Sequence, residues 1–202
     1  YEPWISKDDE KIISKTLKQS MLTLGPQLEK FESDFCKYSK AKYAIAVSNC
    51  TAALHLSLMA LGIKNNDEVI IPDLTFVADA NAIIASNAKP VITDINKENF
   101  FLSISDIKKN ITKNTKAIIP VHIYGQVCNI EEIMDVAKDN NLKVIEDCAH
   151  AVGTFHNSKH VGNLGNTGCF SFYPTKNITT AEGGMVTTNS KKIAEKIRQS
   201  RS

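Results

Sequence analysis

The sequence predicts an α/β domain with a mostly parallel, mixed sheet and helices on both faces. Short apolar and β-branched runs alternate along the chain with longer segments whose apolar residues recur at helical spacing. Such alternation produces parallel strands, because each crossover helix returns the chain to the same end of the sheet. The apolar runs are continuous, which indicates strands that are buried on both faces.

Two helices are expected before the alternation begins. Ser6 is expected to cap the first helix, whose apolar positions are Ile12, Ile13 and Leu17. Gly25–Pro26 breaks the chain and precedes a second helix with an apolar face.

The remaining elements follow from the same two periodicities. The expected strands are Tyr43–Val47, Glu68–Ile71, Pro90–Thr93, Ala117–Ile123, Lys143–Glu146, Gly168–Phe172 and Gly184–Thr188. The expected helices are Thr51–Leu61, Phe76–Ser86, a short helix capped by Ser103, Ile130–Asn140, and one that starts at Lys191.

Composition excludes several classes of protein. The chain has 202 residues, enough for one well-cored domain, and its hydrophobic share of 43% is ordinary for a globular protein. The net charge is +2 without a basic cluster, so nucleic acid is not an expected partner. No apolar stretch is long enough to cross a membrane. The five cysteines are scattered without a CxxC pair, which favours reduced thiols and a cytoplasmic protein.

Polar residues directly after the expected strands gather at one edge of the sheet, where ligands bind in folds of this kind. The segment Ser48–Ala53 opens a helix with small residues and hydroxyls, and its unpaired N–H groups could hold a phosphate. Taken alone, the same segment is better explained by ordinary helix capping, because such caps are common. Phe76 could stack on a flat ring or serve as a core aromatic.

Two charged residues fall at the same edge. Asp147 follows a buried strand, where a carboxylate needs a partner such as a protonated pyridine nitrogen; a cap on the next turn is the other interpretation. Lys176 lies in the loop Ser171–Asn177, which Pro174 keeps out of regular pairing. A partly desolvated amine held there could form an imine with an aldehyde; an ordinary solvated surface lysine is the other interpretation, and it is favoured for Lys176 taken alone. Together these groups favour pyridoxal phosphate (PLP) as cofactor.

Three segments resemble the DegT/DnrJ/EryC1/StrS family of PLP-dependent sugar aminotransferases, which have the type I aminotransferase fold. Phe170–Met185 is similar to the family's lysine loop almost position for position, and Ile145–Gly153 and Pro120–Gln126 support the likeness. The resemblance implies that residues 1–202 are the PLP-binding large domain with an N-terminal helical segment. The C-terminal small domain of family members is expected to be absent from this chain.

The resemblance assigns roles to eight residues. Lys176 matches the lysine that holds PLP covalently, and Asp147 matches the aspartate that pairs with the pyridine nitrogen. Phe76 matches the aromatic that stacks on the ring, and His150 falls where the family has Gln or His near the cofactor's phenolic oxygen. The residues expected around the phosphate are Cys50, Thr51, Ala52 and Ser171. A glycine is usual in the family at the position of Cys50.

The resemblance also implies an activity. An amino group is expected to pass from glutamate, the amino-acid donor, to a nucleotide-linked keto-sugar, and Thr180–Glu182 lean slightly toward amination at C4 rather than C3. Some relatives carry histidine in place of the lysine and act as dehydratases, so Lys176 groups this chain with the aminotransferases. A homodimer with shared active sites is the expected assembly.

Three other functions were weighed. A nicotinamide dehydrogenase needs GxGxxG after the first strand, and Ser48–Cys50 contains no glycine. A metallohydrolase would need three well-placed metal ligands and an open position, and the spacing of the candidate ligands does not indicate such a set. Its candidate ligands are His122, Asp147, Cys148 and His150. A non-catalytic relative that acts as a sensor is the third alternative, and the presence of Lys176 and Asp147 argues against it.

Overall fold

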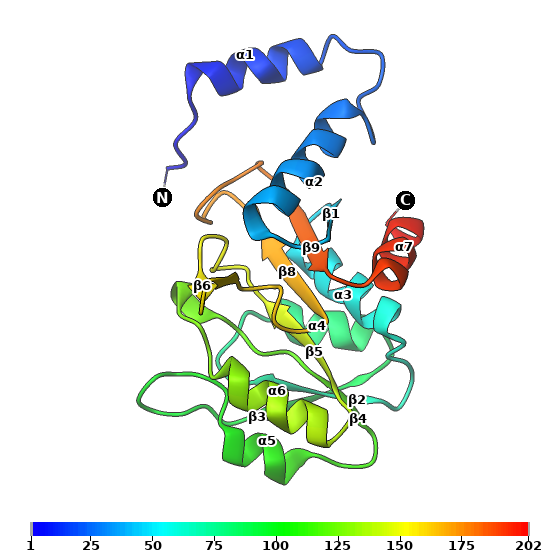
Figure 1. Cartoon of the computed structure of the whole chain (residues 1–202), viewed down its shortest axis with the longest axis vertical. Helices are drawn as coiled ribbons and strands as arrows, with labels where there is room; N and C mark the ends of the chain where they lie inside the picture. The colour runs from blue at the N-terminus through cyan, green and yellow to red at the C-terminus, as the bar shows by residue number, and fades with distance from the viewer. Residues whose placement is uncertain (1, 202) are drawn as a thin grey trace.

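The computed structural model describes residues 2–201, which form a seven-stranded sheet between two layers of helices (Figure 1). Across the sheet the order is β1 (Tyr43–Val47), β9 (Gly184–Thr188), β8 (Thr167–Ser171), β5 (Lys143–Asp147), β4 (Thr115–Ile118), β2 (Glu68–Pro72) and β3 (Lys89–Thr93). Within this sheet β9 runs opposite to the other six strands, which are parallel to one another. The predicted mostly parallel, mixed sheet is therefore confirmed.

The helices cover both faces of the sheet, as expected. One face packs against α3 (Cys50–Leu61), α4 (Ala78–Ala85) and α7 (Lys191–Ser200). The other packs against α2 (Pro26–Ser39), α5 (Ile104–Asn110) and α6 (Ile130–Asp139). Side chains of one strand alternate between these cores, so that Ile45 faces α3 whereas Ala44 faces α2.

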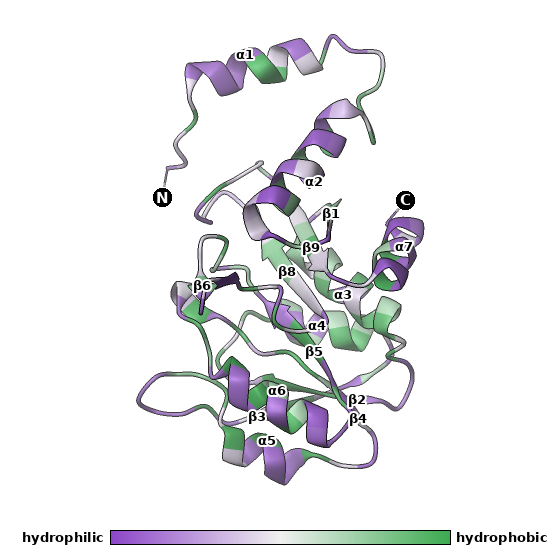
Figure 2. Cartoon of the chain, viewed as in Figure 1, coloured by the Kyte–Doolittle hydropathy of each residue, from purple (hydrophilic) through white to green (hydrophobic). Residues whose placement is uncertain are grey.

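The hydropathy of each helix matches its place in the layers (Figure 2). Helix α3 is apolar around most of its circumference because it contacts the sheet, α4 and α7 at once. Helix α6 instead buries one stripe, which includes Ile133 and Val136, and leaves its acidic and basic residues outside. In the described part of the chain, no helix is long and apolar enough to cross a membrane.

Most predicted bounds agree with the structure within two residues, but the predicted strand Ala117–Ile123 is wrong in its second half. Strand β4 ends at Ile118, and Pro120 cannot donate a ladder hydrogen bond. Beyond it the chain makes a single bridge from Val121 to Asp147 and turns through a 3-10 segment, η1 (Ile123–Gly125). A hairpin of two-residue strands, β6 (Phe155–His156) and β7 (Lys159–His160), was not expected from the sequence.

Helix α1 (Lys7–Thr16) begins where the sequence predicts. Ser6 caps it, and Ser6 and Asp9 form a reciprocal capping box. None of the helix's residues is buried, and its apolar positions face solvent: Ile12 and Ile13 are each 56% exposed and Leu17 is 67% exposed. The helix projects away from the sheet and its covering layers (Figure 1).

Candidate active site

A pocket of about 540 Å³ lies at the carboxyl ends of β1, β2, β5 and β8. This is the edge at which the sequence places the ligand. Seven of the eight predicted site residues line it: Cys50, Thr51, Phe76, Asp147, His150, Ser171 and Lys176. Ala52, the eighth, lies next to Thr51 on α3 and is not among the lining residues.

The first turn of α3 forms one wall of the pocket. Asn49 caps the helix, and its side-chain oxygen accepts the N–H of Ala52 at 2.8 Å. The capping interpretation is thus correct for Asn49. The N–H groups of Cys50 and Thr51 have no acceptor within a helix that starts there, so they and the Thr51 hydroxyl remain suited to an anion.

Gly184 allows β9 to pass close to this turn. A Cβ at Gly184 would lie 2.5 Å from the carbonyl carbon and oxygen of Asn49, a separation that real Cβ atoms do not adopt. Val47, at the end of β1, pairs with Gly184. The glycine therefore fixes the position of the helix end relative to the lysine loop that precedes β9.

Asp147 ends β5 at the base of the pocket and is only 5% exposed. Its Oδ1 accepts the N–H of Ala149 at 2.8 Å. Burial raises the pKa of Asp147, whereas the Ala149 N–H and the positive charge of Lys176 act in the opposite direction. A buried carboxylate in this position favours a cationic ligand group.

Lys176 is held by a loop that closes on Phe172. The N–H of Phe172 donates to Gly183, and its carbonyl accepts from the N–H of Thr180 and the hydroxyl of Thr179 at 3.0 and 2.9 Å. Phe172 itself is completely buried against α2. The loop is therefore anchored at both ends, and Lys176 is half-buried in the wall of the pocket.

His150 lines the pocket shortly after the end of β5 and is half-buried. Its Nδ1 accepts the N–H of Tyr124 at 3.3 Å, and the two rings stack with centroids 5.7 Å apart. Burial and the charge of Lys176 lower the pKa of His150. A neutral ring that accepts at Nδ1 carries its proton on Nε2, so His150 is a hydrogen-bond donor at that atom.

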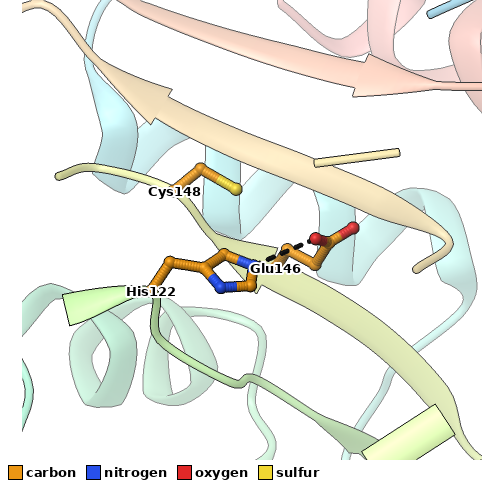
Figure 3. Close-up of side chains that lie close together, drawn as sticks. All are labelled: His122, Glu146 and Cys148. Carbon is orange, nitrogen blue, oxygen red and sulfur yellow. Dashed lines mark hydrogen bonds and ion pairs between the residues drawn. The ribbon is translucent and has the colours of Figure 1, made fainter. Parts of the chain in front are cut away.

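The residues weighed for a metallohydrolase do not form one cluster. His122 points at Glu146, with Nε2 and Oε2 3.0 Å apart, and Cys148 lies beside them (Figure 3). The Glu146 carboxylate also accepts three backbone N–H groups of the 162–165 loop at 2.6–2.8 Å. Nδ1 of His122 accepts the N–H of Cys128. These contacts engage both ring nitrogens of His122 and both oxygens of Glu146, so the buried pair joins three chain segments.

Sequence reasoning missed several lining residues. They include Thr75, Ala78, Val121 and Tyr173. Thr75, Ala78 and Tyr173 lie within two positions of a predicted site residue, and Val121 lies shortly after the end of β4, so nearness to a strand end was the available signal. Glu146 was missed as a partner of His122 because its partners come from loops far along the chain.

The pocket fits a phosphorylated, cationic aromatic cofactor. A helix end suits the phosphate, Phe76 offers a ring at 72% exposure, and Asp147 offers a buried carboxylate. Lys176 supplies an amine beside them. This donor set and the sheet order define the cofactor-binding large domain of a type I aminotransferase fold, with PLP as the matching cofactor.

Comparison with known proteins agrees with this class. The model of the DegT/DnrJ/EryC1/StrS aminotransferase family matches residues 3–202. The chain is 44% identical over 197 residues to GDP-perosamine synthase of Escherichia coli O157:H7. The alignment covers 97% of this chain and 54% of that protein. The chain belongs to the DegT/DnrJ/EryC1/StrS family, whose aminotransferases are PLP-dependent.

Solved structures share the fold closely. The aminotransferase from Psychrobacter cryohalolentis superposes with a TM-score of 0.94 at 36% identity, over 98% of this chain and 51% of that one. NtdA from Bacillus subtilis, described with bound cofactor PMP, gives 0.86 at 35% identity, over 96% and 45%. The chain thus spans about half the length of the relatives that it matches.

Proposed function

We propose that this chain is the cofactor-binding part of a PLP-dependent sugar aminotransferase, which moves an amino group from glutamate to a nucleotide-linked keto-sugar. The convergence of Asp147 and Lys176 on one pocket carries the proposal. Membership of the family and similarity to a protein named GDP-perosamine synthase support it.

Each residue would have a defined task. PLP, when bound, supplies an electron sink for bond breaking at the amino-bearing carbon. Asp147 would keep a proton on the pyridine nitrogen, and Phe76 would cover the ring. Lys176 Nζ would hold the cofactor covalently at rest and, once released, carry a proton to and from the reacting carbon. His150 would donate from Nε2 to the phenolic oxygen.

The phosphate would lie at the start of α3. Cys50, Thr51 and Ala52 surround this position, and Ser171 approaches from the end of β8. Ser171 is nearly buried, and its Oγ accepts the N–H of Tyr173 at 3.4 Å. Its hydroxyl hydrogen therefore stays available for a phosphate oxygen.

The sugar carbon that receives the amino group is proposed to be C4. The support is the segment Thr180–Glu182, of which Glu182 lines the pocket. NMR of the product made from a nucleotide-linked 4-keto-sugar, compared with its 3-keto isomer, tests this choice. Faster turnover of the 3-keto isomer would reverse it.

The domain organisation and assembly are proposals as well. Residues 1–202 would form the large domain with its N-terminal helical segment, and longer relatives carry further sequence. Helix α1 exposes apolar residues that a second subunit would cover, in a homodimer with shared active sites. The five free cysteines suit the reducing cytoplasm.

The test is an absorption spectrum of the full-length protein with PLP, before and after glutamate is added. We expect a band of lysine-bound cofactor that fades with glutamate, and borohydride reduction should place the label on Lys176. Lys176→Ala should abolish turnover, with Lys192→Ala on α7 as an unaffected control. A band that ignores glutamate would refute the donor, and no band would favour the sensor alternative.

A further inference from the structure

A second buried carboxyl group lies behind the pocket. Asp79, in the first turn of α4, is 0% exposed. Its Oδ2 accepts the hydroxyl of Thr75 at 2.5 Å. Among the described residues, its Oδ1 has no hydrogen-bond partner. A fully buried oxygen without a donor is an exception that needs a physical explanation.

A negative charge on Asp79 would be poorly compensated. The groups that share its surroundings are Asp147 on β5, the Cys50 thiol on α3 and the Cys169 thiol on β8. Asp147 is itself a buried acid, and two such groups do not both ionise readily. Burial and the charge of Asp147 raise the pKa of Asp79 well above its usual range.

The start of α4 acts in the opposite direction but more weakly. The positive end of a helix stabilises a nearby carboxylate only modestly, even at partly buried sites. Burying an ion without a partner costs considerably more free energy. Desolvation therefore outweighs the helix dipole. Asp147 is the better site for the charge, because it has the Ala149 N–H and Lys176 nearby.

Asp79 also connects to the pocket wall. Its side chain holds the Thr75 hydroxyl, and its backbone N–H donates to the carbonyl of Phe76 at 3.2 Å. Val77 provides no side-chain cap at the start of α4, so these two contacts hold the turn between β2 and the helix. Thr75 and Phe76 both line the pocket.

We propose that Asp79 is a positioning residue that remains a neutral carboxylic acid, fixes Thr75 and Phe76 in the pocket wall, and leaves the negative charge at the pocket base on Asp147. A neutral acid offers one oxygen to the Thr75 hydroxyl and needs no counter-charge. Asparagine has the same shape and the same acceptor. The protonation state stands without the proposed function; the effect on the pocket wall rests on the proposed PLP site.

The first test measures the melting temperature of the cofactor-free, full-length protein between pH 4 and 8. In the unfolded chain Asp79 loses its proton above about pH 3.9, whereas the folded protein retains it, so the wild type loses stability as pH rises. Asp79→Asn removes this loss. We expect the variant to melt higher by at least about 2 °C near neutral pH, with the difference growing from acid to neutral pH. Asp73→Asn, at an exposed aspartate nearby, is the control.

If the melting temperature of Asp79→Asn minus that of the wild type were independent of pH or negative, the proposal that Asp79 is a neutral acid would be wrong. In that case Asp79 would be an ordinary or an ionised carboxylate with a favourable partner. This result does not depend on any cofactor, so it stands even if the full-length wild type fails to bind PLP, an outcome that would refute only the proposed function.

The second test measures the dissociation constant of PLP. Asp79→Asn should bind within about threefold of the wild type, because it keeps the hold on Thr75. Asp79→Ala and Thr75→Val should each bind about three- to tenfold more weakly, which corresponds to one lost hydrogen bond. Their double variant should match either single variant, since both remove one contact. The positioning role would be wrong if Asp79→Asn weakened PLP binding as much as Asp79→Ala. It would also be wrong if the effects of Asp79→Ala and Thr75→Val on PLP binding were additive.

Discussion

Asp147 and Lys176 are separated in the chain by β6, β7 and β8, yet their charges act on each other across the pocket. The Asp147 carboxylate is nearly buried and accepts the backbone N–H of Ala149. At the residue scale, the site therefore favours a ligand with a cationic group next to Asp147. A protonated pyridine ring meets it, whereas a neutral ring of the same shape does not.

Asp147→Asn is expected to keep the shape of the site and lose its charge. We predict PLP binding at least about tenfold weaker, because one partner of a buried charged pair is removed. Turnover should fall further than binding. Titration of the full-length variant with PLP measures the first effect, and Asp73→Asn provides the comparison at an exposed position. Unchanged affinity would exclude a pyridinium contact.

Residues of the site differ in how far the sequence could predict them. Asp147 and Lys176 were accessible because each follows a strand end and lies in a recognisable segment. Asp79 was not, since it sits inside a helical pattern and only the folded chain buries it. His122 was weighed as a metal ligand because the pattern did not show that Glu146 would occupy it.

At the scale of elements, the pocket depends on how closely β9 approaches the start of α3. Strand bounds such as those of β1 and β9 follow directly from buried apolar runs. The direction of a strand does not follow from such a run, because an antiparallel strand that is buried on both faces has the same apolar pattern as a parallel strand. That is why the reversal at β9 emerged only from the structure.

Gly184→Ala should therefore damage the site as well as the fold. The added methyl would meet backbone atoms of Asn49, which cannot move without displacing the helix end. We predict a loss of about 1–3 kcal/mol in stability and weaker PLP binding. Chemical denaturation and PLP titration measure the two effects.

Gly62→Ala is the matched control for this substitution. Gly62 has a left-handed φ of +84° and no atom within 4 Å of an added Cβ. Backbone strain in Gly62→Ala should lower the free energy of unfolding by about 1 kcal/mol or slightly more. The affinity for PLP should remain unchanged. If Gly184→Ala lowered stability but spared affinity in the same way, the link between β9 and the phosphate end would be refuted.

At the scale of the whole molecule, α1 is the feature that the fold leaves uncovered. Its cap and bounds follow the sequence, but its apolar residues contact no core, so helical periodicity alone misjudges their burial. An apolar helix face predicts that something packs against the face. It does not indicate whether the same chain or another molecule does so.

Ile13→Glu combined with Leu17→Glu is expected to weaken the proposed homodimer. Charges on an apolar contact face should raise the dimer dissociation constant at least about tenfold, as for other central interface residues. Sedimentation of the full-length protein measures it, with Lys15→Glu on the same exposed helix as the control. An unchanged dimer would exclude these residues of α1 from the proposed interface.

The place of β9 in the sheet has a consequence for biosynthesis. Among the described strands β1 pairs with β9 alone, and β9 is the last strand of this sheet to emerge from the ribosome. Until then β1 presents an unpaired edge, and non-local pairings of this kind form slowly. The helix end after β1 and the lysine loop before β9 meet when that last strand inserts. A nascent chain stalled before Gly184 would thus hold most of the sheet and no cofactor site.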